Sequence, residues 1–392
     1  MTGRVLLDLS HYVAHPRASG IQRVLLALVD GAWPPGVDLR PTALVDGRHV
    51  VAPREVAASL LRSGFERRAR GERPVHAADV KSVWLAAALD RVPPDRLPDT
   101  ADGFLSAELT GEPAVLDVLD GVTRSRMRVA ALFYDALPLL HPRWFPGWDH
   151  VAAGRYYRLV AGLEDVAFIS AAVRDEFERR LARRALRNAV VAHPGVDPGG
   201  EPAPAPDRPR LVCVGAVEPR KRTDVVVAAV EAARREGVDV DLTIVGGVST
   251  TDGAFVADLR ARQRDGAFTW LETASDAEVA EVVRTSTAMI YAGELEGYGL
   301  PPLEALAAGV PVVTAAGLPS LEAVGSQGVV TVDTFDVPDV AAAVVRVCRP
   351  AAQQALRAGA RAAATPTWDR FVEVTGRWLL RAMYRADDGR AA

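Results

Sequence analysis

Residues 296–304 read Glu-Gly-Tyr-Gly-Leu-Pro-Pro-Leu-Glu, and they follow a short apolar run at residues 288–291. Pro301 and Pro302 are tolerated in the first turn of a helix, where a missing N–H has no partner, and Gly309 suits the left-handed position after a helix. The sequence therefore predicts a strand, a glycine loop and a short helix that begins near Pro301. Repeated units of this kind build α/β folds with parallel sheets.

The glycine loop predicts a binding place for an anion. Gly297 and Gly299 carry no side chain, so backbone N–H groups can approach a ligand at the positive end of the helix dipole. Glu296 and Glu304, with Glu304 expected in the first helical turn, can both face the same crevice. Carboxylates beside an anion site suit hydroxyl groups, which suggests a phosphorylated sugar. The alternative is that Glu304 only favours the helix dipole and that the glycines only form a turn.

The rest of the chain alternates strand and helix patterns in two halves, which predicts parallel, doubly wound sheets whose ligands bind beyond the carboxyl ends of the strands. Residues 46–120, rich in Arg and Pro, are expected to be irregular, and residues 199–209, where prolines alternate with small residues, are expected to form a linker. Expected strands include 5–9, 130–133, 166–169, 211–214, 242–245, 269–271, 288–291, 312–315 and 329–332, and expected helices include 21–30, 148–162, 224–236, 277–284 and 368–384.

A turn after the strand at 211–214 carries three successive cations, Arg220, Lys221 and Arg222. Guanidinium and ammonium groups placed together offer a diphosphate bidentate and point-charge contacts, although a solvated basic turn is the alternative. Together with the residues around the glycine loop, this turn carries a resemblance to a known family.

The stretch 296–313 resembles the Glu-x7-Glu signature of glycosyltransferase family 4, a group of retaining, metal-independent enzymes that use nucleotide sugars. The turn at 215–222 resembles the family's Gly-x-x-x-Pro-Arg-Lys-Asn element, in which Arg and Lys hold the donor diphosphate, and Arg222 stands where Asn or Gly is common. The resemblance implies the GT-B fold, in which two Rossmann-like domains face each other across a cleft. The implied parts are an acceptor-binding domain at 1–198, a linker at 199–209, a donor-binding domain at 210–365, and a helix at 366–385 that packs back on the first domain.

Shorter stretches extend the resemblance to individual residues. Ser19-Gly-Ile-Gln-Arg resembles the family's Thr-Gly-Ile-Gly-Arg element, which implies that Gly20 contacts the donor; a plain helix entry is the alternative. Tyr134 and Asp135 resemble the family's His-Asp pair, with Tyr in place of His, so Asp135 is a catalytic candidate. By the same resemblance Glu296 is catalytic and contacts sugar hydroxyls, and Glu304 contacts the ribose. The implied donor-binding residues are Gly20, Arg220, Lys221, Leu271, Gly297, Tyr298, Gly299, Leu300 and Glu304.

The histidine and cysteine spacings predict no metal site. The seven histidines include no His-x-x-x-His pair with a helical glutamate, and the two cysteines form no Cys-x-x-Cys pair. Arg220, Lys221 and the loop amides are then the groups that stabilise the departing diphosphate. We therefore expect no cofactor and no metal requirement, with the nucleotide-diphosphate sugar as co-substrate.

The predicted function is retaining hexosyl transfer from a nucleotide-diphosphate sugar to a hydroxyl group of a glycan, a lipid-linked glycan or a small metabolite. A GT-B epimerase, a sugar phosphorylase and a non-catalytic nucleotide-sugar-binding subunit are the alternatives. The net charge of −4 argues against nucleic acid as a partner. Without an apolar run of ~18 residues, we expect a cytoplasmic protein. The basic segment 174–187 is expected to be a solvated helix face, with peripheral contact to an acidic membrane as the alternative.

Overall fold

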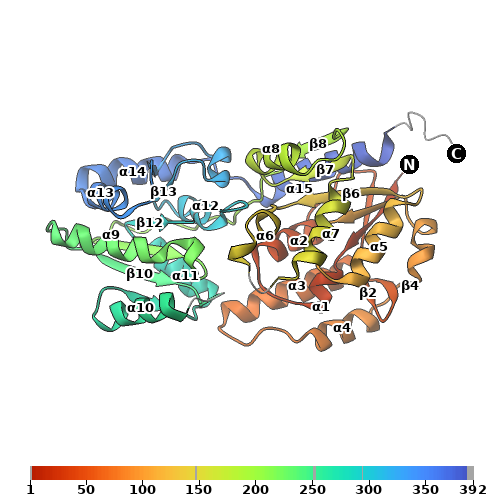
Figure 1. Ribbon diagram of the computed structural model, residues 1–392, viewed down its shortest axis with the longest axis horizontal. Helices are drawn as coiled ribbons and strands as arrows, with labels where there is room; N and C mark the ends of the chain where they lie inside the picture. Colours follow the sequence, from red (N-terminus) through yellow and green to blue (C-terminus); the bar gives the residue numbers. More distant parts are fainter. Residues whose placement is uncertain (1, 146–147, 250–252, 294, 386–392) are drawn as a thin grey trace.

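The computed structural model describes residues 2–145, 148–249, 253–293 and 295–385. Two sheets lie at opposite ends of an elongated molecule, each covered by helices, and we call each sheet with its helices a domain (Figure 1). The first domain contains strands β1 (Gly3–Asp8), β2 (Val37–Val45), β3 (Arg48–Val51), β4 (Asp90–Val92), β5 (Gly103–Ser106), β6 (Arg128–Phe133), β7 (Asp165–Phe168) and β8 (Asn188–Val191), helices α1 (Ser10–Ala14), α2 (Gly20–Asp30), α3 (Arg54–Ala69), α4 (Ala77–Ala86), α5 (Pro113–Thr123), α6 (Leu137–Leu140), α7 (His150–Val160) and α8 (Ala171–Arg180), and 3-10 turns η1 (Pro94–Asp99) and η2 (Pro142–Trp144).

The second domain begins at the next strand, and a long helix follows it in sequence. Its strands are β9 (Arg210–Val214), β10 (Asp241–Val245), β11 (Thr269–Leu271), β12 (Ala288–Tyr291), β13 (Val312–Ala315) and β14 (Val329–Val332), its helices are α9 (Thr223–Arg235), α10 (Gly253–Arg264), α11 (Asp276–Arg284), α12 (Leu300–Ala307), α13 (Val337–Cys348) and α14 (Pro350–Ala362), its 3-10 turns are η3 (Pro219–Lys221) and η4 (Pro319–Ala323), and α15 (Trp368–Tyr384) follows.

Both sheets have the doubly wound topology that the alternating pattern predicted. The first sheet has the order β4-β3-β2-β1-β5-β6-β7-β8, and all neighbours are parallel except β3, which pairs antiparallel with β2 and β4. The second sheet has the order β11-β10-β9-β12-β13-β14 and is parallel throughout. The strand order therefore reverses once in each sheet, between β1 and β5 and between β9 and β12. Such reversal points open a crevice at the carboxyl ends of the strands.

The expectation that residues 46–120 are irregular is wrong. They contain helices α3, α4 and α5 and strands β3, β4 and β5. The helical pattern of α3 is hard to recognise in the sequence, because the helix buries only Ala57, Ala58 and Leu61 while Arg and Glu occupy much of its remaining surface. Helix α4 buries just Val80 and Trp84, one turn apart. With so few large apolar residues, neither helix shows a clear amphipathic period.

Helix α12 follows from the local sequence. Gly299 precedes it with φ at 95°, which a residue with a Cβ rarely adopts, and Leu-Pro-Pro forms its first turn. Gly309 lies beyond its end with φ at 71°, as expected for the left-handed position. Glu304 is the fifth helical residue rather than a member of the first turn. The expectation of a first-turn glutamate is therefore wrong by about one residue, because the helix starts at Leu300 itself.

Helix α15 packs on the first domain although it follows the second in sequence (Figure 1). The indole N–H of Trp378 donates to the carbonyl of Asn188 at 2.8 Å, and this tryptophan is fully buried. The two segments that connect the domains touch where Val196 N–H donates to Pro366 O at 3.0 Å. Within the described residues, no helix is long and apolar enough to span a membrane.

Candidate functional site

Four charged side chains meet at the reversal point of the second sheet, and we call Glu218, Arg220, Lys221 and Glu296 the clamp cluster. The first three come from the turn that follows β9, and Glu296 comes from the loop that follows β12. Because β9 and β12 are neighbours, residues 75 positions apart in sequence reach the same place. The structure thus brings three of the predicted site residues, Arg220, Lys221 and Glu296, into contact. We expected Glu304 to share a crevice with Glu296, but Glu304 pairs with Arg23 instead.

The carboxylate of Glu296 connects the two cations. Lys221 Nζ donates to Glu296 Oε1 in a short ion pair, and Arg220 Nη1 lies 3.3 Å from the same oxygen. Arg220 also pairs with Glu218, and Lys221 Nζ donates to the hydroxyl of Tyr291 at 3.0 Å. The four charged side chains are only 10–15% exposed. Buried charges require partners, and here two cations balance two carboxylates.

The electrostatics keep the arginine charged. Burial lowers the pKa of Arg220, but the carboxylates of Glu296 and Glu218 outweigh that effect and leave the pKa above its usual value. A guanidinium held in a protected position with a fixed partner is a preorganised site for negative charge. An anionic ligand can therefore bind Arg220 and Lys221 either in place of the Glu296 carboxylate or beside it.

Asp135 brings the first domain to this cluster. It follows β6, and its Oδ1 accepts the backbone N–H of Leu137 at 2.9 Å. A Cβ on Gly297 would lie 2.4 Å from Asp135 Oδ2, so the glycine is required for this approach. Burial raises the pKa of Asp135 to about 6, while the Leu137 N–H and the Arg220 charge act in the opposite direction and Glu296 adds to the rise.

Tyr134, which occupies the position of the family's histidine, does not face the cleft as an acid or base. Its side chain is buried, and its hydroxyl donates to the carbonyl of Ala107 at 2.8 Å. Burial and then the nearby Glu108 raise its pKa well above the usual value. Tyr134 therefore stays neutral and supports the loop after β5.

The remaining loop residues hold the two domains together. Tyr298 is buried, stacks on His193 with ring centroids 6.1 Å apart, and donates its hydroxyl to Pro194 O at 3.3 Å. Leu300 lies across from the start of α2, where a Cβ on Gly20 would meet its Cδ1 at 3.6 Å. The structure thus brings Gly20, Tyr298 and Leu300 to the domain boundary.

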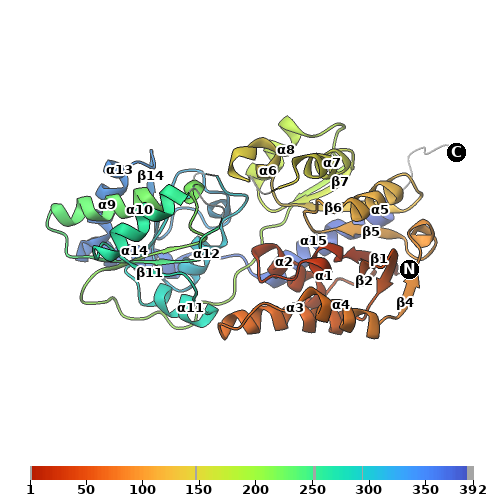
Figure 2. The ribbon, with the colours of Figure 1, turned by 60° about the horizontal axis from the view of Figure 1, so that its bottom comes forward.

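Glu304 lies apart from the clamp cluster and forms an ion pair with Arg23 of α2. Both line a cavity of about 610 Å³ between the domains, together with Asp276 and Trp368. Helices α3 and α11 meet on this side (Figure 2), and a second ion pair joins Arg68 of α3 to Asp276 of α11 at 3.2 Å. No local sequence pattern predicts the Arg23–Glu304 pair, because its members are 281 positions apart.

Leu271 is not brought to the clamp cluster. It ends β11, two strands away from β9, and its carbonyl accepts the N–H of Gly246 at 3.0 Å. Gly246 in turn approaches Gly215 so closely that a Cβ would lie 2.0 Å from the Gly215 carbonyl oxygen. These contacts hold the carboxyl ends of β9, β10 and β11 close together. Leu271 lies on β11, the edge strand of the sheet.

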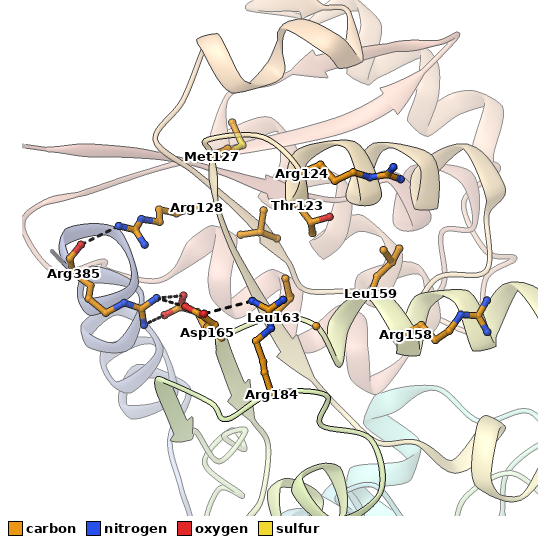
Figure 3. Close-up of a pocket in the computed structure, with 13 residues that line it drawn as sticks. Thr123, Arg124, Met127, Arg128, Arg158, Leu159, Leu163, Asp165, Arg184 and Arg385 are labelled. Atoms are coloured by element: carbon orange, nitrogen blue, oxygen red, sulfur yellow. Dashed lines mark hydrogen bonds and ion pairs between the residues drawn. The ribbon is translucent and has the colours of Figure 1, made fainter. Parts of the chain in front are cut away.

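A second pocket, of about 290 Å³, lies at the amino ends of β6 and β7 in the first sheet (Figure 3). Five arginines line it, but Arg385 pairs with Asp165 at 3.1 Å and with Glu164 at 3.2 Å, and Arg184 lies 3.5 Å from Glu164. Asp165 is the first residue of β7, so the pocket opens at the amino ends of the strands. Its ion pairs fasten the end of α15 to the first domain.

Sequence reasoning missed the polar groups at the reversal point of the first sheet. Asp8 ends β1, Glu108 follows β5, and both are buried. Burial raises the pKa of Asp8 to about 6 against the opposing hydrogen bonds from Ser10, and burial followed by the charge of Asp8 raises the pKa of Glu108 well above its usual value. These residues could have been predicted from the sequence, because each is an acidic residue at or just after the end of an apolar strand.

Comparison with known proteins gives three findings. Residues 208–349 match the family described as Glycosyl transferases group 1. The chain is 30% identical over 329 residues to the D-inositol 3-phosphate glycosyltransferase of Mycolicibacterium smegmatis, which covers 74% of this chain and 73% of that protein. It is 26% identical over 339 residues to the serotype-specific mannosyltransferase WbdA of Escherichia coli, covering 80% of this chain but 37% of WbdA.

The fold has a close counterpart among solved structures. Anabaena HepE, solved in complex with UDP and glucose, superimposes with a TM-score of 0.63 at 13% identity, covering 95% of this chain and 96% of that chain. At that identity the likeness concerns the fold, which is the predicted GT-B arrangement of two Rossmann-like sheets.

Proposed function

The chain belongs to glycosyltransferase family 4, and we propose that it transfers a hexosyl group from a nucleotide-diphosphate sugar to a hydroxyl group, with retention of the anomeric configuration. The observation that carries the proposal is the convergence of Arg220, Lys221 and Glu296 at the reversal point of the second sheet. That place is where open α/β sheets bind their ligands. HepE, a structural neighbour, was solved with UDP, and WbdA is named a mannosyltransferase, so UDP- and GDP-sugars are the first donors to test.

The clamp cluster suits a departing diphosphate. As the bond between the anomeric carbon and the phosphate oxygen breaks, negative charge grows on the diphosphate, and Arg220 and Lys221 are fixed cations that stabilise it without reorganisation. When the phosphate oxygens share these cations, Glu296 becomes free to accept hydrogen bonds from sugar hydroxyls. These two cations supply the charge that a metal ion supplies in other transferases, so we propose that donor binding is metal-independent.

The acceptor enters from the first domain. In the front-face route its hydroxyl oxygen bonds to the anomeric carbon on the side that the diphosphate leaves, and its proton passes to a departing phosphate oxygen. Asp135, a first-domain group held against Gly297, orients the acceptor hydroxyl. The cavity lined by Arg23 and Glu304 would hold the nucleoside, with Glu304 available to the ribose.

The proposal is tested by incubating the full chain with a panel of UDP-, GDP- and dTDP-sugars, with and without mannosides and inositol phosphates as acceptors. We expect thermal stabilisation by one nucleotide class and acceptor-dependent release of the nucleoside diphosphate. NMR of the product should show the anomeric configuration of the donor. A chelator should leave donor binding unchanged. Stabilisation without release would instead indicate a binding subunit, an epimerised sugar an epimerase, and a phosphate-dependent sugar phosphate a phosphorylase.

A further inference from the structure

Two histidines and a glutamate meet at the reversal point of the first sheet. His11 and His15 lie four positions apart on and just after the one-turn helix α1, which follows β1. Glu112 immediately precedes α5, which follows β5. We call these three residues the histidine cluster. The reversal between β1 and β5 brings their elements together, in the part of an α/β domain where ligands bind.

The geometry of the histidine cluster is close to that of a metal site. One ligand atom from each residue can be chosen so that all three lie within 4.8 Å of one another. His15 Nε2 lies 2.8 Å from Glu112 Oε1, and the rings of His11 and His15 have centroids 4.9 Å apart. In a bound site the three atoms would lie at ~2.0–2.2 Å from a common ion, so the side chains would have to draw closer together.

One ring nitrogen lacks a partner. His11 Nδ1 is buried, and among the described residues no group hydrogen-bonds to it. A buried polar atom without a partner costs free energy and often marks a missing water or ion. His15 and Glu112 do have each other, and a metal ion would replace the proton that they share, as metal binding generally releases protons.

An ion can reach the cluster and find compensating charge there. The side chains of His15 and Glu112 are 42% and 44% exposed. Behind the cluster lies the buried carboxylate of Glu108, whose Oε2 accepts the backbone N–H of Tyr12 at 3.1 Å. Arg17 is the neighbouring cation that opposes binding, because its charge is felt at His11. The negative charge of Glu112 offsets it.

We propose that His11, His15 and Glu112 bind a Zn²⁺ ion. Two imidazoles and one carboxylate form a ligand set that Zn²⁺ takes up in proteins, and three protein ligands leave a fourth position for water or another oxygen ligand. The site belongs to the first domain and shares no residue with the clamp cluster. It therefore adds a function to the proposed transferase and is compatible with metal-independent binding of the donor.

The test uses the full chain without an affinity tag, freed of metal with a chelator and titrated with Zn²⁺ in competition with a chromophoric chelator. We expect one equivalent bound per chain. His15→Gln and Glu112→Gln should each weaken binding by at least about tenfold, because each removes one of three ligands. The matched control is the double variant His76→Ala with His150→Ala, which removes two histidines outside the cluster and should bind as the wild type does.

A spectroscopic measurement keeps the proposal falsifiable if a variant folds poorly. Co²⁺ bound in the wild-type chain should give the intense visible absorption of a four- or five-coordinate site, and Zn²⁺ should abolish it. Less than a tenth of an equivalent of Zn²⁺ at micromolar free metal would overturn the proposal. Binding that persists in both Gln variants, or the weak absorption of octahedral Co²⁺, would overturn it as well. None of these measurements depends on transferase activity.

Discussion

The two reversal points have opposite electrostatic designs. At the second sheet, Arg220 and Lys221 balance Glu218 and Glu296 in pairs that leave each side chain little exposed. At the first sheet, Asp8 and Glu108 are buried close together, and no ion pair to either is found in the described part of the chain. A compensated cluster can exchange one anion for another, whereas an uncompensated one holds protons or attracts cations. We therefore propose that the same topology serves two kinds of ligand.

The largest effect that separates the two designs should come from Glu296→Gln. The change removes the negative charge that both cations share, and kcat should fall by ~10²–10³ because sugar contacts near the reacting centre are lost. Glu304→Ala should instead raise the KM for the donor, because it removes a nucleoside contact and the partner of Arg23.

Steady-state kinetics with the donor found in the panel measures both variants, and a thermal melt checks their folding. Small and equal effects on kcat and KM in the two variants would contradict this division between Glu296 and Glu304.

The uncompensated design makes stability depend on pH through Asp8. Its pKa rises from 3.8 to about 6 on folding, mainly through burial, so the folded state binds the proton more tightly. This contribution is fully present below pH 3.8 and is lost as pH rises through about 6, a change of about 3 kcal/mol. Asp8→Asn, which cannot ionise, should therefore gain most of that amount in stability relative to the wild type between pH 4 and pH 7.

Urea denaturation at several pH values measures this difference. Glu108, which faces Asp8, contributes in the same direction in the wild type. Asp95→Asn, an exposed carboxylate of the same domain, is the matched control and should show no such trend. A constant difference between the Asp8 variant and the wild type would show that the carboxylate is compensated after all.

Asp135 lies between the two domains: it is a carboxylate of the first domain that faces the charged residues Arg220 and Glu296 of the second. Its pKa of about 6 is raised chiefly by burial, lowered by Arg220, and raised by Glu296 and Glu176. If the ionised form orients the acceptor, kcat/KM should fall below pH 6 and be about tenfold lower at pH 5 than at pH 7. In Asp135→Asn the rate should be lower and this acid limb should vanish. An unchanged limb in the variant would assign the titration to another group.

The sequence predicted the second domain better than the first, for physical reasons. Strands β11, β12, β13 and β14 have their predicted bounds because short β-branched runs lie between clear helix patterns, and α15 has its predicted bounds because Thr367 caps an amphipathic helix. The clamp cluster was predictable because its residues lie in contiguous motifs at strand ends.

The structure of the first domain was harder to predict, because its sequence patterns are weak or depend on residues far apart in the chain. Helices α3 and α4 bury few large side chains, and the histidine cluster joins residues 97 positions apart, so only the fold brings His15 to Glu112. The spacing of His11 and His15 was visible in the sequence, but a search for a glutamate within the same helix could not find Glu112 on another element. Contacts such as Arg23 with Glu304 depend on the placement of two domains, which no local pattern encodes.

The smallest effect concerns the backbone beside the clamp cluster. Arg222 precedes α9 with φ at 49° and ψ at 35°, a left-handed conformation that disfavours most residues and that Asn adopts readily. Arg222→Asn should therefore stabilise the chain by about 0.5–1 kcal/mol, because the strain disappears while no glycine flexibility is added. Arg235→Asn, near the end of the same helix in ordinary helical conformation, should instead destabilise it by about 0.5 kcal/mol, through lower helix propensity. Urea denaturation compares the two variants. Equal losses in both would mean that the contacts of the Arg222 side chain outweigh its backbone strain, and that the compensated design extends beyond the four residues of the clamp cluster.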